Sequence, residues 1–302
     1  MTIVSTRKTS NRAERLAASA WNDIFSDRAS FAIMGVLNVT PDSFYDGGRY
    51  FSPEAAVRRG REMIGEGASL IDIGGESTRP GSDPVPTDKQ IARVLPIIEA
   101  LAPDAILSID TRDPEVARRC LEAGARIVND VSTLRNIALA EVAAEHGARM
   151  VIMHSRGEPK TMQRNPHYEN VLAEVHEELE RAVGRAERAG ISRERILVDV
   201  GIGFGKRLED NLALLRHLDH FSDLAAGQVL GVSRKSFLGL LGAGETPEDR
   251  LEGSLAAAAW GFCAGVEVFR VHDIAATKKA LNVIAALNEG KERIETTRRA
   301  AW

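Results

Sequence analysis

Short apolar runs rich in β-branched residues alternate with longer segments of helical period from Phe31 onward. The runs are Phe31–Leu37, Leu70–Ile73, Ala105–Ile109, Arg126–Val128, Met150–Met153, Ile196–Val198, Val229–Val232 and Val266–Arg270. The segments in which apolar residues recur at three and four positions are Pro53–Glu66, Asp88–Leu101, Pro114–Ala123, Ile137–His146, Glu169–Ala189, Glu209–Leu218, Ser236–Leu241 continuing into Glu248–Cys263, and Ile274–Asn288. Eight alternating units predict a parallel sheet, and eight is the number that closes into a (β/α)8 TIM barrel.

No linker or shift in composition divides these units, so we expect a single barrel domain over residues 29–290. An extension precedes it over residues 1–28, and a tail follows it over residues 291–302. Within the extension, Asn11–Phe25 could form an amphipathic helix, and its apolar side would carry Leu16, Trp21, Ile24 and Phe25. The extension would then cap the barrel. A disordered extension is the alternative.

Polar residues follow the predicted strands with great regularity. They are Asn38, Glu76, Thr78, Arg79, Asp110, Asn129, His154, Asp199, Arg234, Lys235, Ser236, Arg270 and His272. A single one is usually a turn former or helix cap, and Asp110 before Thr111 and Pro114 fits that interpretation. The regularity over every strand indicates instead one pocket at the carboxyl face, where the long loops Asn38–Ser52 and Gly74–Thr87 also lie.

The chemistry of these residues suggests a ligand with two different ends. Acceptors and an amide suited to a donor-rich heterocycle come from Asp110, Asn129 and Asp199. Donors suited to phosphate come from Arg270, His272, Asn38 and Arg79. A heterocycle that carries a phosphate or pyrophosphate fits both ends. His and Cys show no close repeated spacing, so we expect any Mg²⁺ to bind mainly through the phosphate.

The segment Gly231–Gly239, GVSRKSFLG, joins an apolar run to a predicted helix through a cationic turn. Free amide groups and the dipole at a helix start favour an anion there. The alternative for this segment taken alone is an exposed basic turn.

The composition argues against some classes of binding partner. Lys and Arg number 39 against 43 Asp and Glu, which argues against a nucleic-acid surface that works by bulk charge. We expect no membrane partner, because no run reaches the ~18 apolar residues of a membrane helix. The cysteines Cys120 and Cys263 are far apart, which suits a reducing compartment, and we expect a cytoplasmic protein.

Two long motifs resemble the signature segments of the dihydropteroate synthases, folate-pathway enzymes with a pterin-binding barrel. They are IMGVLNVTPDSFYDGG at Ile33–Gly48 and GASLIDIGGESTRPG at Gly67–Gly81. The resemblance continues in order through SIDT at Ser108, NDVS at Asn129, MHSRGEPKTMQ at Met153, DVGIGFGK at Asp199, GVSRKSFLG at Gly231 and RVHD at Arg270. It covers nearly the whole chain after Phe31.

This resemblance implies that 6-hydroxymethyl-7,8-dihydropterin diphosphate condenses with 4-aminobenzoate by an SN1-like substitution, with Mg²⁺ as cofactor. It also implies a sulfonamide target that forms a homodimer through the last helices. By carry-over the pterin contacts are Asp110, Asn129, Asp199, Lys235, Gly231, Met153, Val131 and Phe204. The diphosphate contacts are Asn38, Arg79, Arg270 and His272, and Asn38 also meets the metal. The aminobenzoate contacts are Thr78, Arg79, Phe204 and Ser236. The residues that carry the chemistry are Asp110, Asp199, Lys235 and Asn38.

The chain departs from the family pattern D-P-G-F-G-F-G-K, because Val200 and Ile202 replace a proline and a phenylalanine. We expect a looser loop and a reshaped pocket wall there. Two alternative functions are a pterin-binding paralogue without catalysis and a pterin-dependent methyltransferase of the same barrel family. A methyltransferase would not need the pairs Lys235–Ser236 and Arg270–His272.

Overall fold

Eight parallel strands close into one barrel, in which each strand pairs with the next and β8 pairs with β1. The computed structural model describes residues 20–25, 30–40, 52–77, 81–244 and 246–299, with side chains of the last helix described to residue 288. The strands are β1 Ala32–Asn38, β2 Leu70–Gly74, β3 Leu107–Asp110, β4 Ile127–Asp130, β5 Arg149–Met153, β6 Ile196–Asp199, β7 Gly227–Leu230 and β8 Val268–Val271. The predicted (β/α)8 barrel is confirmed.

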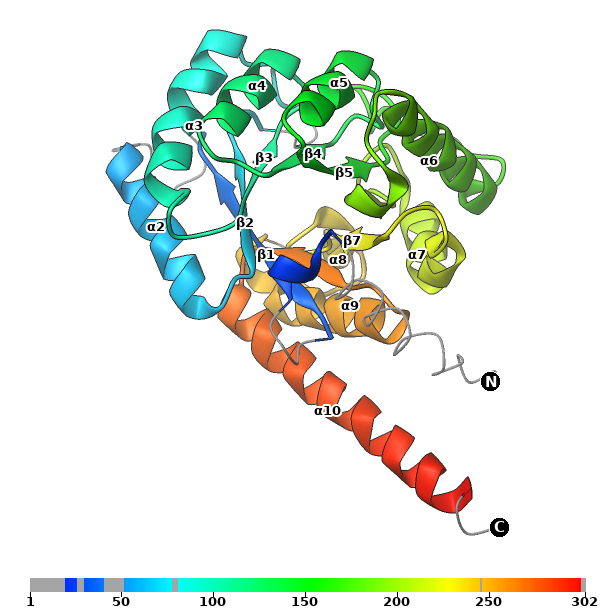
Figure 1. Cartoon of the computed structure of the whole chain (residues 1–302). Helices are drawn as coiled ribbons and strands as arrows, with labels where there is room; N and C mark the ends of the chain where they lie inside the picture. The colour runs from blue at the N-terminus through cyan, green and yellow to red at the C-terminus, as the bar shows by residue number, and fades with distance from the viewer. Residues whose placement is uncertain (1–19, 26–29, 41–51, 78–80, 245, 300–302) are drawn as a thin grey trace.

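The helices surround the strands, as Figure 1 shows. They are α2 Pro53–Glu66, α3 Thr87–Leu101, α4 Pro114–Glu122, α5 Ile137–Glu145, α6 Val171–Arg188, α7 Leu208–Arg216, α8 Ser236–Leu240, α9 Leu251–Cys263 and α10 Ile274–Arg299. Short 3-10 turns are η1 Asn22–Ile24, η2 Arg193–Arg195, η3 Leu218–Phe221 and η4 Glu248–Arg250. Two helical predictions differ from the structure. The segment from Ser236 forms two separate helices, α8 and α9, and α10 continues past Asn288 to Arg299.

Local sequence signals explain where the helices begin. The side chains of Ser52, Asp113, Asn136 and Asn170 each accept a backbone N–H in the first turn of the helix that follows. Pro53 and Pro114 occupy first helical positions, where the missing N–H costs nothing. Because Asp113 caps α4, Asp110 is left free for another role.

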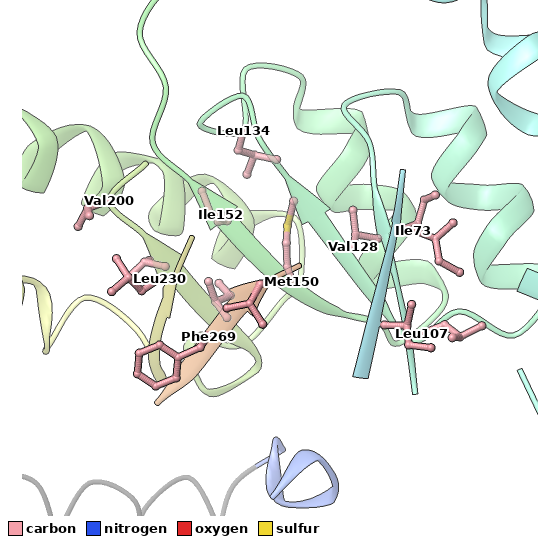
Figure 2. Packing of buried hydrophobic residues seen from close by; sticks show 14 of the residues in the cluster. Ile73, Leu107, Val128, Leu134, Met150, Ile152, Val200, Leu230 and Phe269 are labelled. Atoms are coloured by element: carbon pink, nitrogen blue, oxygen red, sulfur yellow. The ribbon is translucent and has the colours of Figure 1, made fainter. Parts of the chain in front are cut away.

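Side chains alternate between the two faces of the closed sheet. Those that point outward pack under the helices in the larger apolar core, and Figure 2 shows among them Ile73, Leu107, Val128, Met150, Ile152, Leu230 and Phe269. Those that point inward at the amino-terminal end form a second cluster of Ala32, Met34, Leu70, Ile127, Val151, Leu197, Val229 and Val268. The barrel interior is therefore filled at this end, which leaves the carboxyl end for polar groups.

The segment before β1 closes the amino-terminal end of the barrel. Trp21 is fully buried and Ile24 is 2% exposed, and both belong to the inward cluster. The guanidinium of Arg149 lies 4.9 Å from the Trp21 ring and pairs with Asp23. Residues 20–25 thus support the capping interpretation, although they form a 3-10 turn over Asn22–Ile24 and not the end of the predicted helix. The rest of the predicted amphipathic helix, including Leu16, lies outside the described residues.

No helix in the described part of the chain is long and apolar enough to span a bilayer. Cys120 is buried and Cys263 is exposed, and neither forms a disulfide.

Candidate active site

Inward-facing positions turn polar at the carboxyl ends of the strands. They are Asn38 on β1, Asp72 on β2, Ser108 and Asp110 on β3, Asn129 on β4, Asp199 on β6 and Arg270 on β8. All but Asn38 and Arg270 are buried, and those two are half-buried. This polar layer sits on the apolar cluster and forms the floor of the barrel mouth.

Asp72 organises one side of this floor. Its Oδ2 accepts a hydrogen bond from Arg270 Nε at 2.7 Å and another from Asn129 Nδ2 at 2.9 Å. Arg270 also donates from Nη2 to Asp110 Oδ2 at 2.7 Å. Asp72 therefore fixes the orientation of two predicted site residues. Its position inside an apolar strand, LIDIG, is the signal from which it could have been found.

The carboxylate of Asp110 has one bound and one unpaired oxygen. Oδ1 is buried and has no hydrogen-bond partner among the residues that the structure describes, and the same holds for Asp72 Oδ1. Burial raises the pKa of Asp110, and the charge of Arg270 opposes this effect. A buried acceptor without a protein donor is costly unless a ligand supplies one. Asp110 is therefore suited to receive an N–H of a heterocycle.

Asp199 and Lys235 form the opposite side of the mouth. Asp199 Oδ1 accepts from the amide of Gly201 at 2.7 Å. Lys235 Nζ donates to the carbonyl of Ile202 at 2.5 Å and lies 4.7 Å from the ring centroid of Phe204. Burial raises the pKa of Asp199 and lowers that of Lys235 to about 8, and the attraction between the two charges opposes both shifts.

Gly231 lies beside both this carboxylate and this ammonium. A Cβ at this position would lie 3.5 Å from Lys235 Nζ and 3.6 Å from Asp199 Oδ2. These are ordinary van der Waals distances, so Gly231 lies directly against both charged groups, which agrees with its predicted place beside the heterocycle.

Apolar side chains flank the polar floor. Met153 is 5% exposed at the end of β5, and Val131 is 9% exposed just after β4. The turn that carries Val131 is held by Asp130, which accepts from the amides of Ser132 and Leu134. Burial raises the pKa of Asp130 to about 6. Asp130 is a support that the sequence interpretation missed.

Some of the residues predicted to bind the diphosphate and the carboxylate of the aminobenzoate lie at the mouth. Asn38 and Arg270 reach the mouth from neighbouring strands, and the ring of His272 lies 3.0 Å from Ser233 Oγ through Nδ1. Ser236 is exposed and begins α8, which has only five residues. A dipole from so short a helix is a small contribution to anion binding. Thr78 and Arg79 lie outside the described residues.

Three polar residues that follow strands do not join the mouth. His154 bonds to Lys206 and Glu178, and Arg234 forms a forked ion pair with Asp273. Glu76 accepts from the amide of Val85 and from Arg112. These residues hold loops in place instead.

Val200 and Ile202, the departures from the family pattern, are 1% and 0% exposed and belong to the larger core. Figure 2 shows Val200 among the packed apolar residues. Ile202 contributes to the mouth only through its backbone carbonyl, which accepts a hydrogen bond from Lys235 Nζ. Both substitutions are accommodated by burial of an aliphatic side chain.

The sequence model of the pterin binding enzyme family matches residues 34–272. The chain belongs to this family. It is 44% identical to dihydropteroate synthase of Escherichia coli K12 over 263 residues, which cover 86% of this chain and 93% of the relative. As a pterin-binding enzyme it carries the matched motifs at the carboxyl ends of the barrel strands, where the polar floor lies.

Solved structures agree in fold. The Xanthomonas albilineans dihydropteroate synthase with 4-aminobenzoic acid matches with a TM-score of 0.80 and 44% identity, covering 85% of this chain and 93% of that one. The Burkholderia cenocepacia enzyme complexed with 7,8-dihydropteroate matches with a TM-score of 0.80 and 40% identity, covering 89% and 95%. The family barrel is thus shared over almost its full length.

Proposed function

We propose that this chain is a dihydropteroate synthase, which condenses 6-hydroxymethyl-7,8-dihydropterin diphosphate with 4-aminobenzoate to give 7,8-dihydropteroate and diphosphate. The observation that carries this proposal is the convergence of Asp110, Asn129, Asp199 and Lys235 on one floor beside Arg270. The relatives solved with 4-aminobenzoate and with 7,8-dihydropteroate support the choice of substrates.

The reaction breaks the bond between the exocyclic carbon and the diphosphate oxygen before the new bond forms. The electron pair leaves with diphosphate, and the positive charge spreads into the dihydropterin ring. The carboxylates of Asp110 and Asp199 lie where they would stabilise that charge, and Lys235 would bind an acceptor atom of the ring. Because these groups are already held by Arg270 and Gly201, little reorganisation is needed during the reaction.

The second step forms the carbon–nitrogen bond. The amine of 4-aminobenzoate is neutral near pH 7, so it attacks without a strong base and releases one proton to solvent afterwards. Positioning then contributes more than proton transfer. We place the carboxylate of the aminobenzoate near Ser236 and its ring beside Phe204, with Thr78 and Arg79 completing that contact. The exposed position of Ser236 next to Lys235 supports this placement.

Departing diphosphate is bound by Arg270, His272, Asn38 and Arg79 in our proposal. Asn38 suits a Mg²⁺ ion as a single amide oxygen, since Mg²⁺ keeps several waters and binds mainly through phosphate. No group of three His, Cys, Asp or Glu side chains in the described part of the chain could hold a metal alone. When bound, Mg²⁺ would offset the negative charge that builds up on the diphosphate.

We also propose a homodimer in the cytoplasm. Trp260 on α9 and Val283 and Leu287 on α10 are 54%, 60% and 62% exposed. The indole of Trp260 is oriented by a hydrogen bond from Nε1 to the carbonyl of Leu215 at 2.7 Å. Large apolar side chains on two neighbouring helices are typical of a subunit interface. The unpaired cysteines suit a reducing compartment.

The product identifies the reaction. The purified chain is incubated with dihydropterin diphosphate, Mg²⁺ and 4-aminobenzoate, and the mixture is analysed by mass spectrometry. A species with the mass of 7,8-dihydropteroate is expected. If the protein binds the pterin substrate and forms no such species, the non-catalytic paralogue is the better account.

A further inference from the structure

The loop after β6 packs backbone against backbone on the segment after β5. A Cβ on Gly201 would lie 1.8 Å from the carbonyl oxygen of His154, and one on Gly205 would lie 2.1 Å from that of Arg156. Both glycines have positive φ angles, +67° and +63°. Lys206 directly follows Gly205, at the end of this close approach.

Lys206 is 3% exposed, and its ammonium is surrounded by acceptors. Nζ lies 3.1 Å from the carbonyl oxygen of Phe204, 2.8 Å from Nδ1 of His154 and 3.5 Å from the carbonyl oxygen of His154. An ammonium can only donate, so Nδ1 accepts and the imidazole proton resides on Nε2. The contact with Lys206 therefore sets the tautomer of His154.

His154 also contacts Glu178 on the surface helix α6. Nε2 lies 3.0 Å from Oε2 of Glu178, and Oε1 of the same carboxylate accepts from Arg156. Burial lowers the pKa of His154 to about 4, and the hydrogen bond from His154 lowers that of Glu178 to about 2. Near neutral pH His154 is thus a neutral imidazole and Glu178 is a carboxylate.

The same ammonium lies under the turn that holds Asp199. A Cβ on Gly201 would lie 3.4 Å from Lys206 Nζ, and the amide of Gly201 donates to Asp199 Oδ1. Burial lowers the pKa of Lys206 to about 7, and attraction by Asp199 opposes that effect. The other charged groups that act on Lys206 are Lys235 after β7, Arg156 after β5 and Glu178 on α6.

We propose that Lys206 is a positioning residue for the pterin site. Its charge supports the ionised form of Asp199, and its hydrogen bond to the carbonyl of Phe204 fixes the loop. His154 and Glu178 in turn favour the protonated form of Lys206. The proposal rests on the proposed function, because it assigns a role in binding the dihydropterin substrate. Loss of the Lys206 proton removes the positive charge behind Asp199 and leaves two N–H groups for the three acceptors around Nζ. Pterin binding should therefore weaken as Lys206 deprotonates.

Glu178→Gln tests the contacts from Lys206 through His154 to Glu178 at a side chain that is partly exposed. The variant keeps an acceptor for His154 and removes the negative charge that favours protonated Lys206. In the pH profile of kcat/KM for the dihydropterin diphosphate, the alkaline midpoint should move to lower pH by roughly 0.5 to 1 unit. Glu174→Gln is the matched control, because Glu174 lies on the same helix, is equally exposed at 31% and also binds Arg156, without contacting His154. Its midpoint should stay at the wild-type value.

Lys206→Met provides a second measurement. We expect KM for the dihydropterin diphosphate to rise roughly tenfold, with a smaller change in kcat, because binding of the ground state is what Lys206 supports. An alkaline midpoint that is the same in Glu178→Gln, Glu174→Gln and wild type overturns the inference, even if Lys206→Met does not fold. A wild-type protein with no aminobenzoate-dependent release of diphosphate instead overturns the proposed function, and the inference with it.

Discussion

Arg270 Nη2 donates to Asp110 Oδ2 at 2.7 Å, so a guanidinium from β8 and a carboxylate from β3 meet across the barrel mouth. Arg270 is also a predicted diphosphate ligand. One residue thus joins the end of the mouth that holds the heterocycle to the end that receives the leaving group. Asp72 completes the arrangement by accepting from Nε of the same arginine.

Arg270→Lys should therefore disable the site while preserving the charge. An ammonium cannot donate to Asp72 and Asp110 in the forked geometry of the guanidinium. We expect kcat/KM to fall roughly a hundredfold, on the scale measured when one positioned donor is lost from an active site. Steady-state kinetics on the folded variant measure this.

Arg193→Lys is a matched control, because Arg193 makes a forked pair with Glu187 outside the mouth. Its kcat/KM should match the wild type. Equal activity in Arg270→Lys and wild type would remove Arg270 from the mechanism.

Lys235→Met should separate activity from stability. The folded pKa of Lys235 is about 8 against an ordinary value of 10.5. Between these values the unfolded chain binds more protons than the folded one, so wild-type stability gains a contribution as pH rises through this window. The variant lacks this contribution and should also lose turnover by roughly two to three orders of magnitude.

Chemical denaturation of wild type and Lys235→Met below pH 8 and above pH 10 gives the comparison. The stability gap should shift in favour of the wild type at the higher pH. A gap that does not change with pH would contradict the assigned environment of Lys235.

The fold was predictable because strands of a parallel barrel are buried on both faces and read as apolar runs. The exact ends of the strands were harder to predict. The predicted strands stop at Leu37, Ile109 and Val198, whereas β1, β3 and β6 continue by one residue. The added residues are the site residues Asn38, Asp110 and Asp199, where the apolar pattern stops although backbone pairing continues.

Side-chain direction explains which candidate residues reach the mouth. Met153 ends β5 and is inward by the alternation of the strand, so His154 points the other way, toward Lys206 and Glu178. Order along the chain alone places His154 at the mouth, and counting alternate positions from the apolar inner cluster would have corrected this. Asp72 was missed because it lies inside a strand and not after it.

Gly201→Ala should be strongly destabilising, since its Cβ would overlap the carbonyl oxygen of His154 at 1.8 Å. Gly203→Ala is the control in the same loop. It also has a positive φ, +84°, but the nearest atom to its Cβ would be Cδ of the Lys235 side chain, at an ordinary contact distance of 3.5 Å.

We expect a loss of roughly 3 kcal/mol or more for Gly201→Ala, from the clash and the backbone together. For Gly203→Ala we expect about 1 to 2 kcal/mol, from the backbone alone. Urea denaturation measures both. Similar losses in the two variants would mean that the loop yields to the added Cβ.

Val283→Asp should disrupt the proposed dimer. The substitution places a charge among exposed apolar side chains of α9 and α10, at a cost only where that surface is covered. Sedimentation velocity should show a dimer for wild type and a shift toward monomer for the variant. Glu141→Lys, on α5 away from these helices, should leave the dimer intact. A monomeric wild type would contradict the proposal.

Release of diphosphate from the dihydropterin diphosphate, measured in Mg²⁺ with and without 4-aminobenzoate, tests the central claim most directly. We predict rapid release with 4-aminobenzoate, little without it, and a large loss in a folded Asp199→Asn variant. A folded wild-type protein that releases no diphosphate, or releases it at the same rate without 4-aminobenzoate, would contradict the account.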